Sequence, residues 1–454
     1  MFAKTFAIVF LLASSGWALQ VSEPHYPTAV CASLKAELKE GPVGYLPSAA
    51  ESKADTSRIQ TALKNCGSGK ALKLVKGTGN AFLSGPLTIP SGVTLWIDSG
   101  VTLFASRNPR DFDKTSHSCG VLGAHSDGCK PLITVSNTKN SGIMGAGTID
   151  GRGGQKMIGG SETWWELALK AKNSGKEQSC PRLIVVTDSQ SFTLYQIRLH
   201  NSPNFHFVTT NVDGLTVWGV KVDTPSKAYP ASTHARNTDA FDPNGRNMVF
   251  SDLYVNTGDD NIAIKGGKSH VSNVIIQNSH FYKGHGMCIG SETNQGVSNV
   301  TVKNLSIDGA DNGIRIKSDA SNGGTVTGVT YENICIRNVG SPLVFDSFYT
   351  SKKGSLIPKF QDIHVTKTHI ISSTKKEVVF RGHDKNAPLK IYLDNVVSDV
   401  ALKVTASDAE IHEGPGSTTN IGVKTDSAKN VKVIGSPGKS TTIDCSKMFV
   451  AFPR

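Results

Sequence analysis

The sequence predicts an all-β protein folded as a parallel β-helix, because short apolar segments recur at intervals of 26 to 29 residues. The aligned segments begin at Asn247, Asn273, Asn299 and Gly328. The polar column consists of Asp252, Asn278, Asn304 and Asn333, and the apolar column of Val255, Phe281, Ile307 and Ile336. Polar side chains stacked at a turn, beside apolar side chains stacked in a core, are typical of this architecture.

A second strand-like segment in each repeat brings polar residues to one face. The aligned segments span 261–265, 286–290 and 313–317. Alternation along the strand turns Arg315 and Lys317 outward. Asp260 and His285 occupy the position just before two of these strands, and Asp239 extends the column by one coil. Since adjacent coils lie about 4.8 Å apart, we expect these side chains to be neighbours in a solvent-facing cleft.

The other segments extend this pattern in both directions. Residues 1–18 have the basic start and short apolar run of a secretory signal peptide. Residues 55–66 have helical spacing, with Asp55 as a candidate N-cap, and such a helix would close the N-terminal end of the stack. Further strands are expected at 91–98, 99–104, 132–135, 141–144, 183–186, 192–195, 378–380 and 391–393. No linker divides the chain, so residues 19–454 are expected to form one β-helix domain.

The eight cysteines suit an oxidising compartment. The candidate disulfides are Cys119 with Cys129 and Cys31 with Cys66. Cys288 and Cys335 lie in strand-like runs and are expected as buried thiols, while Cys445 has no evident partner. The spacing does not fix the connectivity, and no cysteine and histidine spacing suggests zinc.

The charge of the chain is basic, with 48 Lys and Arg against 37 Asp and Glu and a formal net charge of +11. This excess attracts polyanions, or serves only solubility. The chain has neither a basic tail nor a basic helix interleaved with aromatic residues, so we expect no nucleic-acid partner. After the first residues no apolar run reaches about 18 residues, so we expect no membrane span.

Three carboxylates, Asp239, Asp259 and Asp260, are the centre of the predicted site. Asp residues are common in β-helix turns, so an isolated Asp-Asp pair would be interpreted as structural. Three in register cannot all ionise at their ordinary pKa, and one should be pushed upward. Such a group supplies both an acid and a base for water, which inverting glycoside hydrolysis needs.

The side chains beside these carboxylates favour an anionic substrate. His285 lies between two glycines, which lets backbone approach closely and leaves the ring accessible. Arg315 and Lys317, taken alone, would be ordinary solvent-facing charges. Beside an acidic cluster they suit a clamp for a carboxylate, because Arg binds it bidentately and Lys supplies a point charge.

Four motifs in this order resemble the signature set of polygalacturonases, the pectin-hydrolysing glycoside hydrolases of family 28. They are Asn-Thr-Asp at 237–239, Gly-Asp-Asp at 258–260, Gly-His-Gly at 284–286 and Arg-Ile-Lys at 315–317. The resemblance covers about residues 40–400, and residues 200–355 are most similar to bacterial members. It implies a right-handed, single-stranded parallel β-helix of the pectin-lyase-like kind.

The resemblance also implies an activity, the hydrolysis of α-1,4 links between galacturonate units with inversion and without a metal or other cofactor. By position, Asp259 would be the general acid, and Asp239 and Asp260 would activate the water. His285 would set the protonation of the acid. The protein is then expected to be a secreted, extracellular monomer that degrades pectin in cell walls.

The resemblance also implies four substrate-binding residues. Arg315 and Lys317 would bind the galacturonate carboxylate, Asn237 would orient the site, and Tyr349 would contact the substrate. The chain departs from the family pattern at Ala240-Phe241, and at Cys288 where Ser is common; neither departure is expected to touch the chemistry. The segment after about residue 400 is longer than the family suggests, and it could add coils or form a packing arm.

The residues leave several alternatives open. We expect internal cleavage of the polymer, but an exo-acting enzyme or a rhamnogalacturonan hydrolase would use a similar site. A pectate lyase would instead hold calcium on the Asp cluster and use Arg315 as base. A non-catalytic β-helix that binds polysaccharide, such as a phage tailspike, is the remaining alternative.

Overall fold

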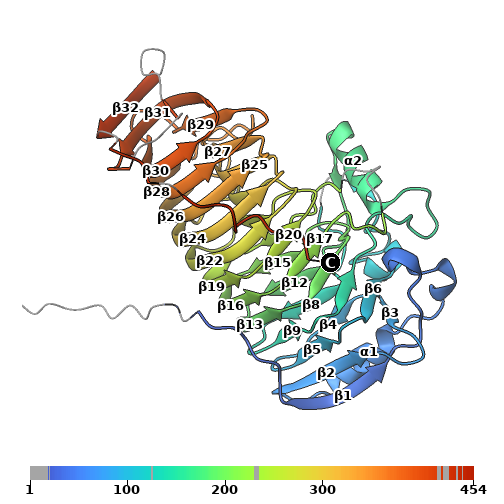
Figure 1. Cartoon of the computed structure of the whole chain (residues 1–454). Helices are drawn as coiled ribbons and strands as arrows, with labels where there is room; N and C mark the ends of the chain where they lie inside the picture. Colours follow the sequence, from blue (N-terminus) through green and yellow to red (C-terminus); the bar gives the residue numbers. More distant parts are fainter. Residues whose placement is uncertain are drawn as a thin grey trace, which may run out of the picture.

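The chain forms one long stack of coils in the computed structural model (Figure 1). The structure describes residues 19, 21–123, 126–229, 235–416, 421–422, 429–435, 438–441 and 443–453. The predicted signal peptide, 1–18, lies outside the described residues. Each strand of the long sheet pairs in parallel with the corresponding strand one coil later, which is the predicted parallel β-helix.

Three parallel ladders run along the stack. The first contains β1 (Ala29–Lys35), β2 (Lys70–Val75), β5 (Thr94–Ile97), β9 (Gly142–Met144), β13 (Gln190–Tyr195), β16 (Val212–Trp218), β19 (Gly245–Ser251), β22 (Val271–Phe281), β24 (Val297–Asp308), β26 (Gly324–Arg337), β28 (Pro358–Ile370), β30 (Leu389–Ser398), β31 (Lys403–Glu413) and β32 (Lys429–Gly435). The second contains β4 (Leu87–Thr88), β8 (Ile133–Ser136), β12 (Ile184–Thr187), β15 (Phe207–Thr210), β18 (Phe241–Asp242), β21 (Ile262–Ile264), β23 (Met287–Ile289), β25 (Asn312–Lys317), β27 (Ser341–Asp346) and β29 (Glu377–Arg381), and it ends on β31. The third contains β3 (Ala81–Ser84), β6 (Thr102–Ala105), β10 (Thr148–Asp150), β14 (Arg198–His200), β17 (Lys221–Asp223) and β20 (Tyr254–Asn256), and it ends on β22.

The register confirms the predicted columns. Phe281 pairs with both Val255 and Ile307, and all three side chains are buried in the core. In the polar column the side-chain amide of Asn304 donates to Asn278 at 3.0 Å, and that of Asn333 donates to Asn304 at 2.7 Å. These asparagines have φ between 50° and 57°, a left-handed conformation that Asn tolerates better than other residues with a side chain.

The predicted helix is α1 (Thr56–Lys64), near the N-terminal end of the stack (Figure 1). Its Ile59 and Leu63 are buried in the core. Asp55 takes the N-cap position, but its side chain makes no cap hydrogen bond. It accepts instead from the backbone N–H of Leu83 at 3.0 Å and pairs with Arg58, so it ties the helix to strand β3.

A second helix, α2 (Trp164–Ser174), is absent from the sequence-based expectation. Thr163 and Glu166 form a reciprocal capping box at its start, and Gly175 ends it with φ 63°. These signals are visible in the sequence. The remaining short elements are the 3-10 turns η1 (Pro42–Gly44), η2 (Ser48–Ala50) and η3 (Pro109–Phe112) and the antiparallel pair β7 (Leu122–Gly123) and β11 (Glu177–Gln178).

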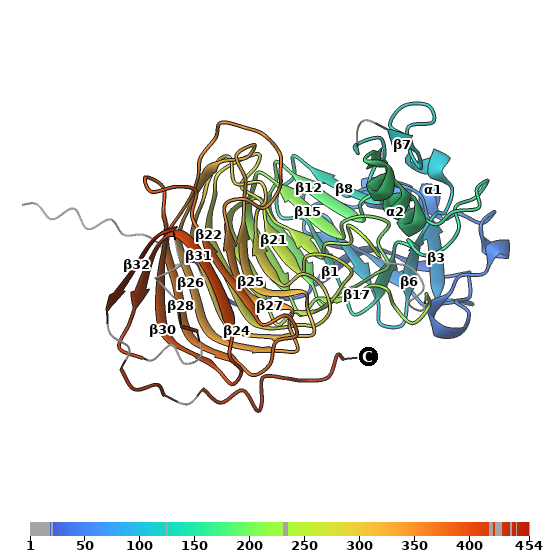
Figure 2. The ribbon, with the colours of Figure 1, turned by 90° about the horizontal axis from the view of Figure 1, so that it is seen from above.

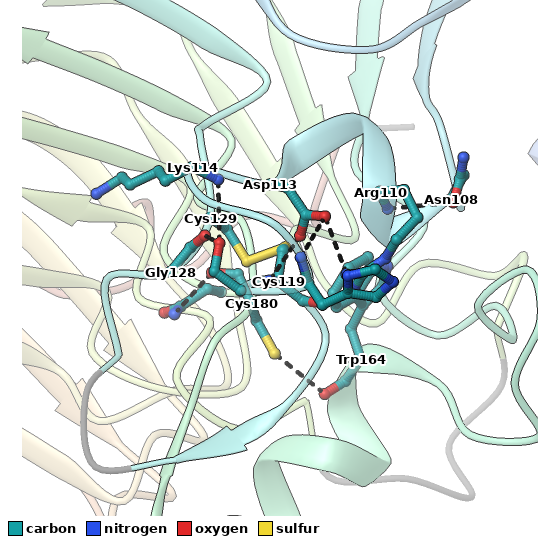
Figure 3. Close-up of a disulfide and its surroundings, with 12 residues drawn as sticks. Asn108, Arg110, Asp113, Lys114, Cys119, Gly128, Cys129, Trp164 and Cys180 are labelled. Carbon is teal, nitrogen blue, oxygen red and sulfur yellow. Dashed lines mark hydrogen bonds and ion pairs between the residues drawn. A yellow bond between two sulfur atoms is a disulfide. The ribbon is translucent and has the colours of Figure 1, made fainter.

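Both predicted disulfides, Cys31–Cys66 and Cys119–Cys129, are present. Figure 3 shows the second one, with the thiol of Cys180 directed at the carbonyl oxygen of Trp164 at 3.7 Å. Cys288 is a buried thiol, as expected.

The predictions for Cys335 and Cys445 are wrong, because these two residues are bonded to each other across 110 positions. The segment after residue 400 both adds coils, through β31 and β32, and forms a packing arm, residues 438–441 and 443–453 (Figure 2). The arm runs back over earlier coils, where the hydroxyl of Tyr282 donates to the carbonyl of Val450 at 3.0 Å. No helix among the described residues is long and apolar enough to cross a membrane.

Candidate active site

The second ladder positions the predicted site residues. Asp239 comes just before β18, Asp259 and Asp260 before β21, and His285 before β23. These strands pair in register, Phe241 with Ile262, Ile262 with Met287 and Met287 with Ile314. The stacking inferred from the sequence therefore brings residues from four coils to one place.

The glycines on either side of His285 are required by close backbone packing. Gly284 has φ 137°, and a Cβ there would lie 2.6 Å from the Asn261 side-chain oxygen. Gly286 has φ 86°, and a Cβ there would lie 2.1 Å from the carbonyl oxygen of Asn312. The backbone N–H of Gly286 donates to Asn261 at 2.8 Å, and that of His285 donates to the Asp259 carbonyl at 2.9 Å. These contacts fix the imidazole beside the acidic cluster.

Asp260 is the most buried of the three carboxylates, at 1% exposure. Lys317 Nζ donates to its Oδ2 at 2.6 Å, and the thiol of Cys288 donates to its Oδ1 at 3.2 Å. Burial alone would raise the pKa of Asp260, but the charge of Lys317 and the hydrogen bond from His285 hold that pKa far below its ordinary value. Asp260 is therefore a fixed anion.

Two sequence-based expectations need correction at this point of the site. Lys317 does turn away from the core, but its side chain is only 6% exposed, because it is committed to Asp260 at the floor of the cluster. The departure at Cys288 does touch the site, since its thiol contacts the same carboxylate.

Asp259 and His285 reach the surface. Their side chains are 13% and 31% exposed, and His285 Nδ1 lies 2.9 Å from Asp259 Oδ1. The other oxygen of Asp259 accepts from the backbone N–H of Asn237 at 3.1 Å. Burial would lower the pKa of His285, but its hydrogen bonds to Asp259 and Asp260 raise that pKa to about 9. Burial would likewise raise the pKa of Asp259, and the hydrogen bond from His285 brings it below its ordinary value.

Asp239 is the carboxylate whose pKa is pushed upward, as the clustering predicts for one of the three. The residue is only 4% exposed, and its Oδ1 has no hydrogen-bond partner in the described part of the chain. Burial and the negative charge of Asp259 raise its pKa well above the ordinary value. The pKa is thus raised for Asp239 and His285 and lowered for Asp259 and Asp260.

The predicted binding residues surround one side of this cluster. Arg315 lies over the ring of Tyr349 at 4.8 Å, and Lys317 Nζ lies 5.0 Å from the same ring. Tyr349 is 40% exposed, and Arg315 Nε has no partner among the described residues. Asn237 contributes its backbone N–H to Asp259 and accepts from Gln178 at 3.3 Å. All eight predicted residues therefore gather at one site.

The cluster also has the outline of a cation site, because ligand-type atoms of Asp259, Asp260 and His285 lie within 4.8 Å of one another. The donor set fits a metal poorly. Lys317 already neutralises Asp260, and the raised pKa of His285 keeps its imidazole protonated, whereas a metal ligand must be the neutral ring.

Comparison with known proteins decides the family. The sequence model of glycosyl hydrolases family 28 matches residues 66–436. The chain belongs to that family. As a family 28 member it is 44% identical to a polygalacturonase of Ralstonia solanacearum over 95% of this chain and 92% of the relative. It is 46% identical to an endo-polygalacturonase of Pectobacterium carotovorum subsp. carotovorum over 83% of this chain and 88% of the relative.

Solved structures agree with this family 28 assignment. A polygalacturonase from Erwinia carotovora ssp. carotovora superposes with a TM-score of 0.74 at 41% identity, over 92% of this chain and 99% of that one. A tailspike protein of Escherichia coli bacteriophage HK620 superposes with a TM-score of 0.52 at 12% identity, which shows a shared fold alone. The chain is thus a glycosyl hydrolase on a parallel β-helix.

Two neighbours of the cluster are missing from the sequence-based site. Asp242 and Lys265 lie at the far ends of β18 and β21, 3.6 Å apart, and Glu292 lies 3.2 Å from Lys265. Alternation could have found Asp242, because Phe241 beside it faces the core. Lys265 likewise follows Ile264, which faces the core, so alternation predicts that its side chain points outward. The sequence pattern does not predict its ion-pair partners.

Proposed function

We propose that this family 28 member hydrolyses α-1,4-galacturonosidic links of polygalacturonate with inversion, and that it cuts within the chain. The observation that carries the proposal is the surface pair Asp259 and His285 set against the buried carboxylates Asp239 and Asp260. The names of the bacterial relatives, polygalacturonase and endo-polygalacturonase, support the substrate and the internal cut.

Asp259 is the general acid in this proposal because, of the three carboxylates, it reaches farthest toward solvent. His285 donates to it at 2.9 Å and carries the proton at rest. The proton that Asp259 gives to the glycosidic oxygen comes from His285, which transfers it to Asp259 along this hydrogen bond and is left as the neutral imidazole. The acid is therefore the Asp259–His285 couple, and His285 sets its protonation.

Asp239 and Asp260 hold the attacking water, and each carboxylate has a different role. Asp260 is pinned by Lys317 and has a strongly lowered pKa, so it orients the water as a fixed acceptor and is a weak base. Asp239 has a raised pKa and an oxygen, Oδ1, that is buried without a hydrogen-bond donor among the described residues, so its ionised form is the stronger base and takes the proton from water. Inversion follows when the water attacks from the face opposite the acid.

Arg315 is the group best placed to bind the galacturonate carboxylate, since its guanidinium lies over the exposed ring of Tyr349 at 4.8 Å, which holds it in place beside the cluster. Tyr349 offers an exposed face to the sugar. Lys317 adds positive potential but reaches the substrate less directly, because Asp260 holds it. Asn237 orients the acid through its backbone N–H.

The experiment that tests this proposal is a digest of polygalacturonate with product sizing and proton NMR of the newly formed ends. Internal hydrolysis with inversion gives oligomers of many lengths and β-configured reducing ends. Release of single units would make the enzyme exo-acting, and cleavage of rhamnogalacturonan instead would change the substrate. Binding without new reducing ends would leave a non-catalytic polysaccharide-binding protein.

A calcium-dependent pectate lyase can be distinguished from a hydrolase by its products and by the effect of a chelator on its rate. We expect EDTA to leave the rate unchanged, because Lys317 and protonated His285 supply the positive charge that a lyase takes from calcium. Ultraviolet-absorbing unsaturated ends, lost on chelation, would contradict hydrolysis. Secretion to the extracellular space and a monomeric state complete the proposal, and mass analysis of secreted protein checks both.

A further inference from the structure

A buried histidine contacts the main chain of Asp239 and has no role in the proposed chemistry. His206 comes just before β15, one coil before Asp239, and it is fully buried. Its ring Nδ1 lies 3.1 Å from the carbonyl oxygen of Asp239, and its backbone N–H donates to the same oxygen at 2.8 Å. His206 thus makes two hydrogen bonds to the main chain of the residue that supplies the base.

The groups around the His206 ring determine which of its nitrogens carries the proton. The carbonyl oxygen of Asp239 can only accept, so Nδ1 is the donor. Nε2 faces the hydroxyl of Thr224 at 2.8 Å and the backbone N–H of Ser202 at 3.4 Å, and an N–H can only donate. Nε2 is therefore the acceptor, and the ring is neutral. Burial favours the same state, because it lowers the pKa of His206 to about 4.

Thr224 is held in one orientation by a buried network. Its Oγ1 accepts from the backbone N–H of Asn201 at 2.7 Å, so its own proton is left to donate to His206. The side-chain amide of Asn201 donates to Asp150 and to Ser226, both at 2.8 Å. Asp150, Asn201 and Thr224 follow β10, β14 and β17, which pair in register on three consecutive coils. The His206 ring is therefore fixed relative to the stack and not to a single loop.

The carboxylate of Asp239 depends on this support of its main chain. Its Oδ1 is buried without a hydrogen-bond donor among the described residues, so no bond to that atom sets the direction of the side chain. On the other side of the residue, the backbone N–H of Ala240 donates to the carbonyl of Asp260 at 3.0 Å. Asp239 is thus held between His206 in the preceding coil and Asp260 in the following one.

We propose that His206 is a positioning residue for the hydrolysis, and that its neutral ring fixes the main chain of Asp239 and hence the carboxylate that takes the proton from water. This inference rests on the proposed function, in which Asp239 is the base. Without the ring donor, the carbonyl of Asp239 keeps only its backbone bond, and the peptide group is free to tilt. Such a tilt matters, because a misplacement of about 1 Å costs about a hundredfold in rate.

The same displacement changes the basicity of Asp239. Besides burial, the charges of Asp259, Asp242 and Asp260 raise its pKa, and the charge of Lys265 lowers it. A carboxylate released from its place moves away from the like charges, so its pKa falls. Because the base acts in its ionised form, the acid limb of the pH profile of kcat then moves toward lower pH.

The experiment removes the hydroxyl of Thr224, which frees Nε2 without changing the size of the side chain. Thr224→Val should lower kcat on polygalacturonate about tenfold or more, leave KM nearly unchanged and move the acid limb to lower pH. Thr224→Ser keeps the hydroxyl and should restore both. The control, Thr368→Val, removes an equally buried hydroxyl that donates to the carbonyl of Thr366 at 3.2 Å in β28. It should change neither kcat nor the pH profile.

Nitrogen NMR of the imidazoles reads the tautomer directly, and the spectrum of His206→Asn identifies the signal of His206. The parent should carry the proton on Nδ1, and Thr224→Val should populate the Nε2 form. A parent ring protonated on Nε2, or a Thr224→Val enzyme with the kcat and pH profile of the Thr368→Val control, would overturn the proposal while leaving hydrolysis in place. If the parent does not cleave polygalacturonate, the proposed function fails instead, and the tautomer still decides whether His206 holds Asp239.

Discussion

Replacing Lys317 by Met should destabilise the protein strongly at neutral pH. The side chains of Lys317 and Asp260 are 6% and 2% exposed, and their charged atoms lie 2.6 Å apart. Removing one partner of such a pair leaves an uncompensated buried charge, which costs about 3–5 kcal/mol. For a chain of 454 residues this lowers the Tm by about 3–6 °C.

The sign of the pH dependence follows from Asp260. In the parent its pKa is lowered, so its stabilising contribution is present above the unfolded pKa of about 3.9 and is lost only as pH falls through the still lower folded pKa. Without Lys317, burial raises that pKa instead, and the carboxyl becomes neutral as the pH falls. The loss of stability should therefore be largest near neutral pH and smaller under acid conditions.

Thermal unfolding of parent and variant at neutral and acid pH measures this effect. Lys367→Met is the matched control, because its partner Glu332 is 42% exposed and the exposed pair contributes about 0–1 kcal/mol. Adding Asp260→Asn to Lys317→Met should restore much of the lost stability. An equal Tm for the Lys317 and Lys367 variants, or a deficit that grows as pH falls, would refute the reasoning.

Three further predictions concern the same cluster. Asp259→Asn should lower kcat by about a hundredfold or more with unchanged circular dichroism, since it removes the acid; a near-parental rate would exclude this role. Cys288→Ala should shift the pH profile of kcat, because Asp260 loses the thiol donor that lies at 3.2 Å. Cys288→Ser should restore the parental profile, and Cys180→Ser, whose thiol faces the carbonyl of Trp164, should leave the profile unchanged. Identical profiles for all three variants would contradict a role for the contact between Cys288 and Asp260. Gly284→Ala should reduce both stability and kcat, because its Cβ would lie 2.7 Å from the Asp259 carbonyl oxygen, and unfolding and rate measurements check both.

The repeat made most of the fold predictable. Asn278, Asn304 and Asn333 recur because each turn needs a left-handed residue whose amide can bond to the next coil, and that requirement is local. The same regularity placed Asp239, Asp260 and His285 on three successive coils. Local pattern was sufficient wherever a residue's position followed from the pairing of one coil with the next.

The sequence pattern could not predict how deeply a side chain is buried or which residues far apart in the sequence are in contact. Alternation tells that Lys317 turns away from the core, but only the packed cluster tells that Asp260 buries it. The bond between Cys335 and Cys445 joins residues 110 positions apart, and the arm that carries Cys445 has no repeat of its own.

The arm has a consequence for how the stack comes apart. A solenoid ordinarily frays from its ends, because a terminal coil has a neighbour on one side only. In this chain the last residues are tethered through Cys335 and rest with Phe452 against Tyr282, several turns inward. Loosening the outermost turn therefore pulls on the middle of the rod, so the C-terminal tip and the interior should resist proteases as one unit.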